Sequence, residues 1–382
     1  MRFRQSLSRA SGPTLAAFLV TLVLAILPRS VAGQYKQFNL VTNMPRFQAH
    51  AIFRDPNLLN PWGITLSPTS PFWISDNHAG VSTLYRTIVG VPFPRPTPLV
   101  VAIPPPAGSS GPAAPTGIVF NGTSKFVVTQ GGKSGASAFI FATEDGTISG
   151  WSPAVDGTHA ILAVDNSASP GVDNTQSQAI YKGLAIASDG NHIYATNFRD
   201  GIVEIYDGNF KFVSWFTDPG LSPDAPEPGF APFGIQDIGG KLYVTFAMQD
   251  DDKTDDSKGP GSGFIDVFDE SGTFIRRFAS GGTLNSPWGM ALAPSNFGPF
   301  SHDLLVGNFG DGRINAFDPT SGKFLGQLTD LRGNPLAIEG LWGLIFGNGR
   351  FGQRTNSLFF TAGPNIEKDG LFGRIQAIAA AQ

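Results

Sequence analysis

The sequence has no cysteine, and this absence is the first fact that limits its chemistry. A protein without thiols has neither a cysteine nucleophile nor a disulfide scaffold, and it cannot build a zinc site from cysteine. Histidine is scarce as well, with 5 residues in a chain of 382. A Ser-His-Asp hydrolase needs one of them beside a nucleophile, but no Gly-x-Ser-x-Gly motif is present.

Charge is also low, since charged residues make up 15% of the chain and the formal net charge is −4. Surfaces that bind nucleic acid are rich in Lys and Arg, so we expect no nucleic-acid partner. The segment Gly131–Ser134 contains Gly-Lys-Ser but lacks the upstream glycine of a phosphate-binding loop.

Long hydrophobic runs are confined to the N-terminus, where an apolar stretch covers residues 15–27. Arginines precede this stretch and small residues follow it, which is the order found in secretory signal peptides. The stretch is too short to span a bilayer comfortably. We therefore predict a signal peptide over residues 1–33 and a secreted protein, periplasmic if the host is bacterial, with no membrane span after the signal is removed. The alternative is an uncleaved anchor.

The abundant residues are those of short aromatic strands joined by turns, with 32 Phe, 47 Gly and 30 Pro. A glycine that opens an apolar strand recurs at intervals of 51 to 66 residues, and a second strand follows each copy. These anchor glycines are Gly63, Gly117, Gly183, Gly234, Gly289 and Gly343. Units of this length, with about four short strands each, match the blades of a β-propeller.

We therefore predict an all-β fold, a six-bladed β-propeller that occupies residues 34–382 as a single domain. In the second unit, Pro115–Phe120 and Lys125–Gln130 are expected to be the first two strands. The last unit ends one strand short, so we expect the N-terminal segment Tyr35–Val41 to complete the last blade. A polar insertion, Gln249–Gly263, separates the second and third strands of the fourth unit.

A glycine-led strand, a second strand, an Asp-Gly turn and a strand ending in Phe-Asp together resemble an NHL-type repeat. The motifs that carry a closer similarity are Asn60–Gly63, Phe139–Trp151, Phe230–Gly234, Ser286–Gly289, Gly307–Asn315 and Thr361–Gly363. They resemble a family of uncharacterised exported proteins with six-bladed propellers. The resemblance covers the mature chain and implies the fold, but the family supplies no catalytic motif to transfer.

Polar residues in the loops around the channel are the first candidate site. In propellers, the loops that enter first strands and those that leave second strands gather on one face, here called the loop face. Oxygen ligands for a hard cation such as Ca²⁺ are expected there from Asn77, Asn197, Asn308 and Glu339. His78 is the best placed histidine. The alternative is that these residues belong to ordinary hairpin turns.

Aromatic residues just before the anchor glycines are the second candidate. Trp62, Trp288 and Trp342 either form a floor for a sugar or another flat ligand, or pack between blades. Their repetition at symmetric positions favours packing. Two further features have simpler interpretations: the acidic segment Asp250–Asp256 is read as a solvated loop, and glycosylation of the Asn121 sequon depends on the host.

The sequence thus favours an exported, monomeric binding module rather than an enzyme, whose loop face meets a protein, a glycan or a small molecule. The expected ligand-binding residues are Trp62, Asn77, His78, Asn197, Trp288, Asn308 and Trp342. The alternative is a calcium-dependent propeller hydrolase such as a lactonase, in which the metal activates water. A structural component of a matrix or envelope is the third interpretation.

Overall fold

The computed structural model describes Met1 and residues 33–87, 93–168, 178–221 and 229–378. The predicted signal peptide, residues 1–33, lies outside the described residues except for its two ends. In the described part of the chain the only α-helix is α1 (Arg46–Ala49), and η1 (Asn77–Ala79) and η2 (Gly298–Phe300) are short 3-10 helices. Within the same residues, no helix is long and apolar enough to cross a membrane.

Four separate sheets have four strands each, which follow one another in chain order across the sheet. The first contains β3 (Pro61–Thr65), β4 (Phe72–Asp76), β5 (Val81–Arg86) and β6 (Arg95–Ala102). The second contains β7 (Pro115–Phe120), β10 (Phe139–Thr143), β11 (Thr147–Trp151) and β12 (Ile161–Asp165). The third contains β13 (Tyr181–Ile186), β14 (His192–Asn197), β15 (Ile202–Asp207) and β16 (Phe212–Phe216). The fourth contains β17 (Phe230–Asp237), β18 (Lys241–Met248), β19 (Phe264–Asp269) and β20 (Phe274–Ser280).

Nine further strands form one sheet that consists of two arrays joined by the N-terminal strand. One array contains β21 (Pro287–Leu292), β22 (Leu304–Asn308), β23 (Ile314–Phe317) and β24 (Phe324–Thr329). The other contains β25 (Leu341–Phe346), β26 (Ser357–Ala362), β27 (Leu371–Ala377) and β1 (Gly33–Thr42), with β2 (Phe53–Arg54) beside β1. β1 runs antiparallel to β27 and also pairs with β24 at two positions. The N-terminal segment therefore completes the last array, as the sequence predicts.

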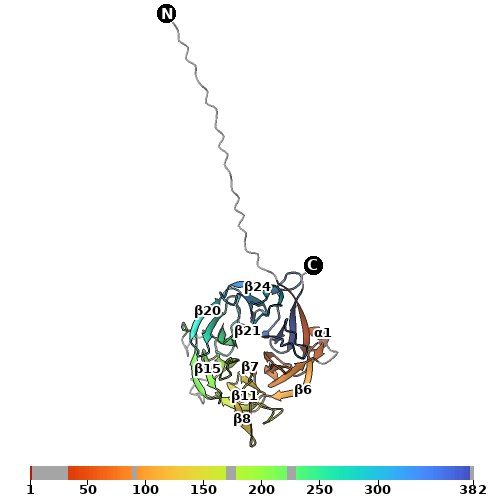
Figure 1. Ribbon diagram of the computed structural model, residues 1–382, viewed down its shortest axis with the longest axis vertical. Coiled ribbons are helices and arrows are strands. Elements are labelled where there is room, and N and C mark those ends of the chain that lie inside the picture. The colour runs from red at the N-terminus through yellow and green to blue at the C-terminus, as the bar shows by residue number, and fades with distance from the viewer. Residues whose placement is uncertain (2–32, 88–92, 169–177, 222–228, 379–382) are drawn as a thin grey trace. The chain divides into compact units, whose positions relative to one another are not determined.

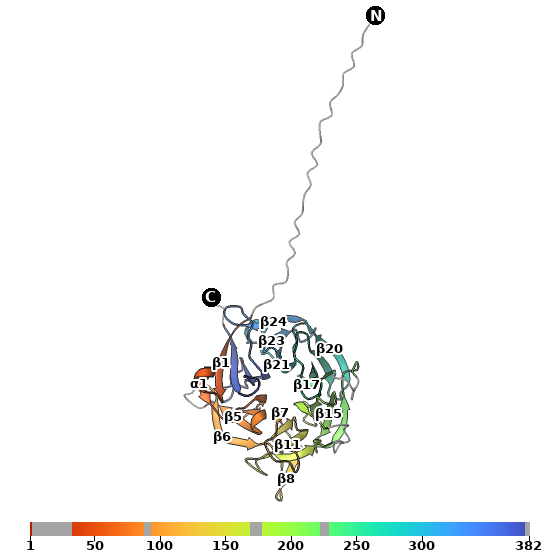
Figure 2. The ribbon, with the colours of Figure 1, turned by 180° about the vertical axis from the view of Figure 1, so that it is seen from behind.

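The first strands of these sheets and arrays contact one another in a closed circle, in the order β3, β7, β13, β17, β21, β25 and back to β3. The other strands follow outward, so the sheets stand around a central axis (Figures 1 and 2). This arrangement is a β-propeller. Apolar side chains of neighbouring sheets pack between them, as where Trp73 of the first sheet stacks on Phe139 of the second.

The anchor glycines explain how the first strands approach so closely at the axis. A Cβ atom on Gly289 would lie 2.2 Å from the carbonyl oxygen of Trp342, the residue before the next anchor glycine. The same relationship recurs at four of the other five anchor glycines, and it closes where Gly343 lies against the carbonyl oxygen of Trp62. Gly117 instead faces the backbone nitrogen of Leu184. Any side chain at these positions would push two neighbouring sheets apart, because backbone atoms cannot move aside cheaply.

One strand of the second unit differs from the prediction. The expected second strand, Lys125–Gln130, is not in the sheet, because β8 (Val127–Gln130) pairs with β9 (Lys133–Ala136) in a separate hairpin. β10 takes the second place instead. An inner strand is covered on both faces by neighbouring sheets, and all five residues of β10 are buried, whereas three of the four in β8 are exposed.

Candidate functional site

Aromatic side chains fill the end of the central channel at which the first strands begin, which we call the plugged end. Trp62 and Phe309 both stack on Trp342, with ring centroids 3.6 and 3.8 Å from it. Nε1 of Trp288 donates a hydrogen bond of 3.0 Å to the carbonyl oxygen of Lys182, on a strand that is not its neighbour in the circle. Because these side chains meet across the axis, they close the channel.

The three tryptophans of the predicted aromatic floor are therefore buried, with exposed fractions of 2% for Trp62, 9% for Trp288 and 1% for Trp342. Their rings contact one another and the neighbouring phenylalanines. This is the arrangement that the packing interpretation predicts. Their role in ligand binding stays a prediction.

A lysine ammonium lies beside this plug, although its side chain is only 1% exposed. Nζ of Lys182 donates to Glu144 at 2.5 Å and to Asp255 at 2.7 Å, and it lies 5.2 Å from the centre of the Trp62 ring. Burial by itself would lower the pKa of Lys182, but the two carboxylates outweigh it and raise the pKa. The two carboxylates thus favour the protonated form of Lys182, which is not the form of an amine nucleophile.

Two of the predicted site residues lie near carboxylates at this end of the channel, and one of them, Asn77, contacts the group around Lys182. Asn77 donates to the second carboxylate oxygen of Glu144 at 2.8 Å. Nε2 of His78 lies 3.4 Å from Nδ2 of Asn60, and the same amide nitrogen donates to Glu367 at 2.9 Å. The structure therefore gathers Asn77 and His78 at the plugged end, within hydrogen-bonded groups that include carboxylates.

Asn197 and Asn308 have local partners instead. Nδ2 of Asn197 donates to Asp200 at 2.8 Å and to Glu204 at 2.7 Å. In the same way, Nδ2 of Asn308 donates to Asp311 at 3.0 Å. An asparagine that binds an aspartate three residues later holds its own turn, which is the turn interpretation considered for these residues.

Glu339, the fourth predicted metal ligand, is exposed and accepts a hydrogen bond of 2.9 Å from the backbone N–H of Asn365. The four predicted ligands thus have protein partners of their own. Across the residues that the structure describes, no group of three or more His, Asp or Glu side chains is arranged to hold a metal ion.

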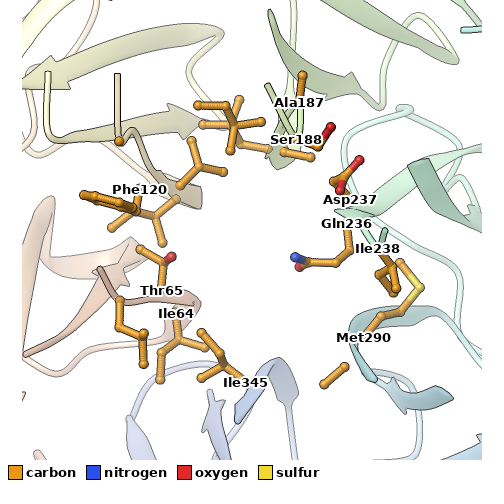
Figure 3. A pocket seen from close by; sticks show the side chains of 18 of the residues that line it. Ile64, Thr65, Phe120, Ala187, Ser188, Gln236, Asp237, Ile238, Met290 and Ile345 are labelled. Carbon is orange, nitrogen blue, oxygen red and sulfur yellow. The ribbon is translucent and has the colours of Figure 1, made fainter. Parts of the chain in front are cut away.

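The other end of the channel, where the first strands end, opens as a cavity of about 730 Å³, which we call the open mouth (Figure 3). Every first strand contributes side chains to its wall, among them Ile64, Ile118, Leu184, Met290 and Leu344. Gln236, on β17, points towards the middle of the opening (Figure 3). Further in, between the anchor glycines, lies a smaller cavity of about 40 Å³. The channel is therefore closed at one end and open at the other.

The sequence predictions did not include the open mouth, although one signal for it is present. The residue after each anchor glycine is apolar in all six units: Ile64, Ile118, Leu184, Ile235, Met290 and Leu344. These residues line the channel beyond the plug. A strand that places glycine against one neighbouring sheet turns its next side chain to the opposite side, towards the other neighbouring sheet, so that only part of each side chain borders the channel.

Comparisons with known proteins identify relatives in a virus. The chain is 32% identical to the uncharacterised protein L690 of Acanthamoeba polyphaga mimivirus over 355 residues, which cover 91% of this chain and 87% of the relative. It is 33% identical to the uncharacterised protein R648 of the same virus over 352 residues, with coverages of 91% and 82%. A solved structure of a catalytically inactive virginiamycin B lyase from Staphylococcus aureus with quinupristin has a TM-score of 0.46 and 12% identity, and covers 90% of this chain and 99% of that chain. No protein-family model matches the chain.

Proposed function

The chain belongs to the family of the mimivirus proteins L690 and R648, and we propose that it is a six-bladed, NHL-like β-propeller that binds a small molecule. The closed circle of first strands supports the number of blades. Neither relative's name states an activity, so the proposal about function rests on the geometry of the channel.

The observation that carries the proposal is that the channel is a one-ended pocket. The plug of Trp62, Trp288 and Trp342 closes one end, while the open mouth surrounds about 730 Å³ with apolar and polar surface in about equal parts. A concave site that combines apolar surface with fixed polar groups, formed by rigid strands, suits a small molecule. It is pre-formed, so little conformational entropy is lost on binding.

Binding of the neutral dye N-phenylnaphthylamine, followed by its fluorescence, tests this proposal. Gln236→Trp should fill the opening and weaken dye binding by at least about tenfold. Gln236→Ala is the matched control, because it removes the same exposed side chain without filling the space, and it should bind the dye as well as the parent. Equal binding by both variants would place the dye elsewhere and reject the proposal.

The loop face, which is the face at the plugged end, remains a second candidate site. It would bind a protein or glycan partner, because carboxylates and amides gather there around Lys182. The calcium-dependent hydrolase has less support. The ammonium of Lys182 already lies between Glu144 and Asp255, and a second cation beside it would be repelled. Metal analysis after dialysis separates the two: about one Ca²⁺ per chain, lost on Asn77→Ala, would favour the hydrolase.

We also propose that the protein is exported, on the basis of the basic, apolar and small residues in segment 1–33. N-terminal sequencing of the protein from the culture medium or periplasm tests this. A mature chain beginning near Gln34 is the expected result, and an intact Met1 in a protein that stays inside the cell would contradict it.

A further inference from the structure

The charged groups that line the open mouth all have one sign. Two carboxylates, Asp189 and Asp237, belong to its wall, and within the described residues no Lys, Arg or His does. Both carboxylates lie on the same side, where the β13–β14 and β17–β18 hairpins turn. A ligand that enters this cavity therefore meets a wall of mixed apolar and polar surface and an acidic rim.

The negative charge of Asp189 is partly compensated. The side chain of Asn191 donates a hydrogen bond to it, and the ammonium of Lys125 in turn contacts that asparagine. Asp237 has no such compensation. Its Oδ1 accepts the N–H of Gly240, at 3.2 Å, and the side chain that interacts with its carboxyl group is another acid, Glu270. The rim thus places Asp237 beside a second carboxyl group rather than beside a base.

A third carboxylate stands beside Asp237. Glu270, from the β19–β20 turn, accepts the backbone N–H of Ser188 at 2.6 Å, and Ser188 is itself a wall residue next to Asp237 (Figure 3). Burial, and then the charge of Glu270, raise the pKa of Asp237 to about 6. The same carboxylates, with burial first, raise the pKa of the nearby Tyr194. Several acidic groups thus converge where basic groups are absent from the wall.

We propose that the open mouth binds an organic cation, a molecule with an apolar body and a single ammonium group. The body lies against Ile64, Ile118, Met290 and their neighbours, and the ammonium lies at the rim against Asp237. Phe120, in the wall on the far side of the mouth, offers an aromatic surface to the same ligand (Figure 3). This inference rests on the proposed function, because it names the ligand class of the same site.

Three probes with one alkyl chain and different charges test it: octyltrimethylammonium, octanol and octyl sulfate, each used below its micelle concentration to displace the neutral dye at pH 8. At that pH Asp237 is ionised. The cation should displace the dye at an about tenfold lower concentration than octanol, and the sulfate should be the weakest. Asp237→Asn keeps the acceptor for Gly240 and should bring the cation to within about twofold of octanol.

Asp251→Asn is the control, since it removes the same charge from an exposed residue in the insertion at the plugged end, and it should leave all three probes unchanged. Equal displacement by the cation and octanol would overturn the inference and leave the small-molecule site standing. Tighter binding of octyl sulfate would also overturn it. Failure of the dye itself to bind, or to respond to Gln236→Trp, would remove the proposed function and the inference together.

Discussion

Trp62 of the first sheet stacks on Trp342 of the last array, with ring centroids 3.6 Å apart and 19° between the ring planes. Nε1 of Trp342 also donates to the Asn60 side chain at 3.1 Å. These two residues come from opposite ends of the described chain, so their contact helps to close the circle of sheets. It also forms part of the plug that makes the channel a one-ended pocket.

Removal of the Trp342 side chain should greatly lower the stability of the fold. We expect Trp342→Ala to lower the free energy of unfolding by about 3–5 kcal/mol, because a large aromatic side chain is lost from a packed interior. Guanidinium denaturation measures the loss. Trp215→Ala, at an exposed position on β16, should change stability by less than about 0.5 kcal/mol. Similar losses in the two variants would contradict the plug as a structural element.

The anchor glycines should not accept even a methyl group. In Gly289→Ala the new Cβ would lie 2.2 Å from the Trp342 carbonyl oxygen and 3.1 Å from the Leu344 nitrogen, so we expect a loss of at least about 1–3 kcal/mol. Thermal unfolding provides the measurement. Gly157→Ala is the control, since its Cβ would meet no atom within 4 Å. An unchanged melting temperature in Gly289→Ala would show that the first strands can separate without cost.

The buried ammonium of Lys182 should contribute more to the free energy of unfolding than its exposed partner Asp255 does. Lys182→Met leaves Glu144 beside an apolar plug, so we expect a loss of about 3 kcal/mol, which the added change Glu144→Gln should partly restore. Asp255→Asn should cost less than about 1 kcal/mol, because the side chain of Asp255 is 69% exposed. Denaturant unfolding of the single and double variants measures this order. A larger loss in Asp255→Asn than in Lys182→Met would be inconsistent with it.

A buried carboxyl pair should make stability depend on pH between about 4 and 8. Asp266 and Asp218 share Arg277, whose nitrogens lie 2.5 and 2.7 Å from them. Burial, and then the neighbouring Asp218, raise the pKa of Asp266 to about 8, against the opposing effect of Arg277. The folded state therefore retains a proton that an unfolded aspartate, with a pKa of 3.8, has already lost. This contribution to stability is complete at acid pH and disappears as the pH rises through about 8.

We accordingly expect this contribution to stability to fall between about pH 4 and pH 8, and the fall to be smaller in Asp266→Asn, where no proton is exchanged. Denaturant midpoints across this range measure the slope. Asp218 does not interfere: hydrogen bonds from Asp266 and Arg277 prevail over its burial and lower its pKa, so it titrates only in acid. Asp318→Asn, an exposed aspartate with a lowered pKa, should keep the parent slope. Identical slopes in all three proteins would mean that Asp266 is ionised throughout.

Much of this architecture could be predicted from the sequence because the information is local and repeated. Each anchor glycine marks the first strand of a unit, and the interval between the glycines gives the number of short strands in each unit. The missing last strand follows from the repeat as well, and β1 supplies it. The second unit was predicted less well, since Lys125–Gln130 and Phe139–Thr143 both have strand-forming residues. Burial on both faces, rather than strand propensity, selects the second of them.

The sequence by itself determined the repeat, the anchor glycines and the closure by β1, because each depends on residues close together in a unit or on the count of strands. Only the tertiary structure decided which end of the channel is filled. That outcome depends on contacts across the axis, such as Trp62 with Lys182 and Trp62 with Trp288, between units that are far apart in the chain. Periodicity places an aromatic residue before the anchor glycine in four of the six units, but it does not say which side chains meet in the middle or which mouth they leave open.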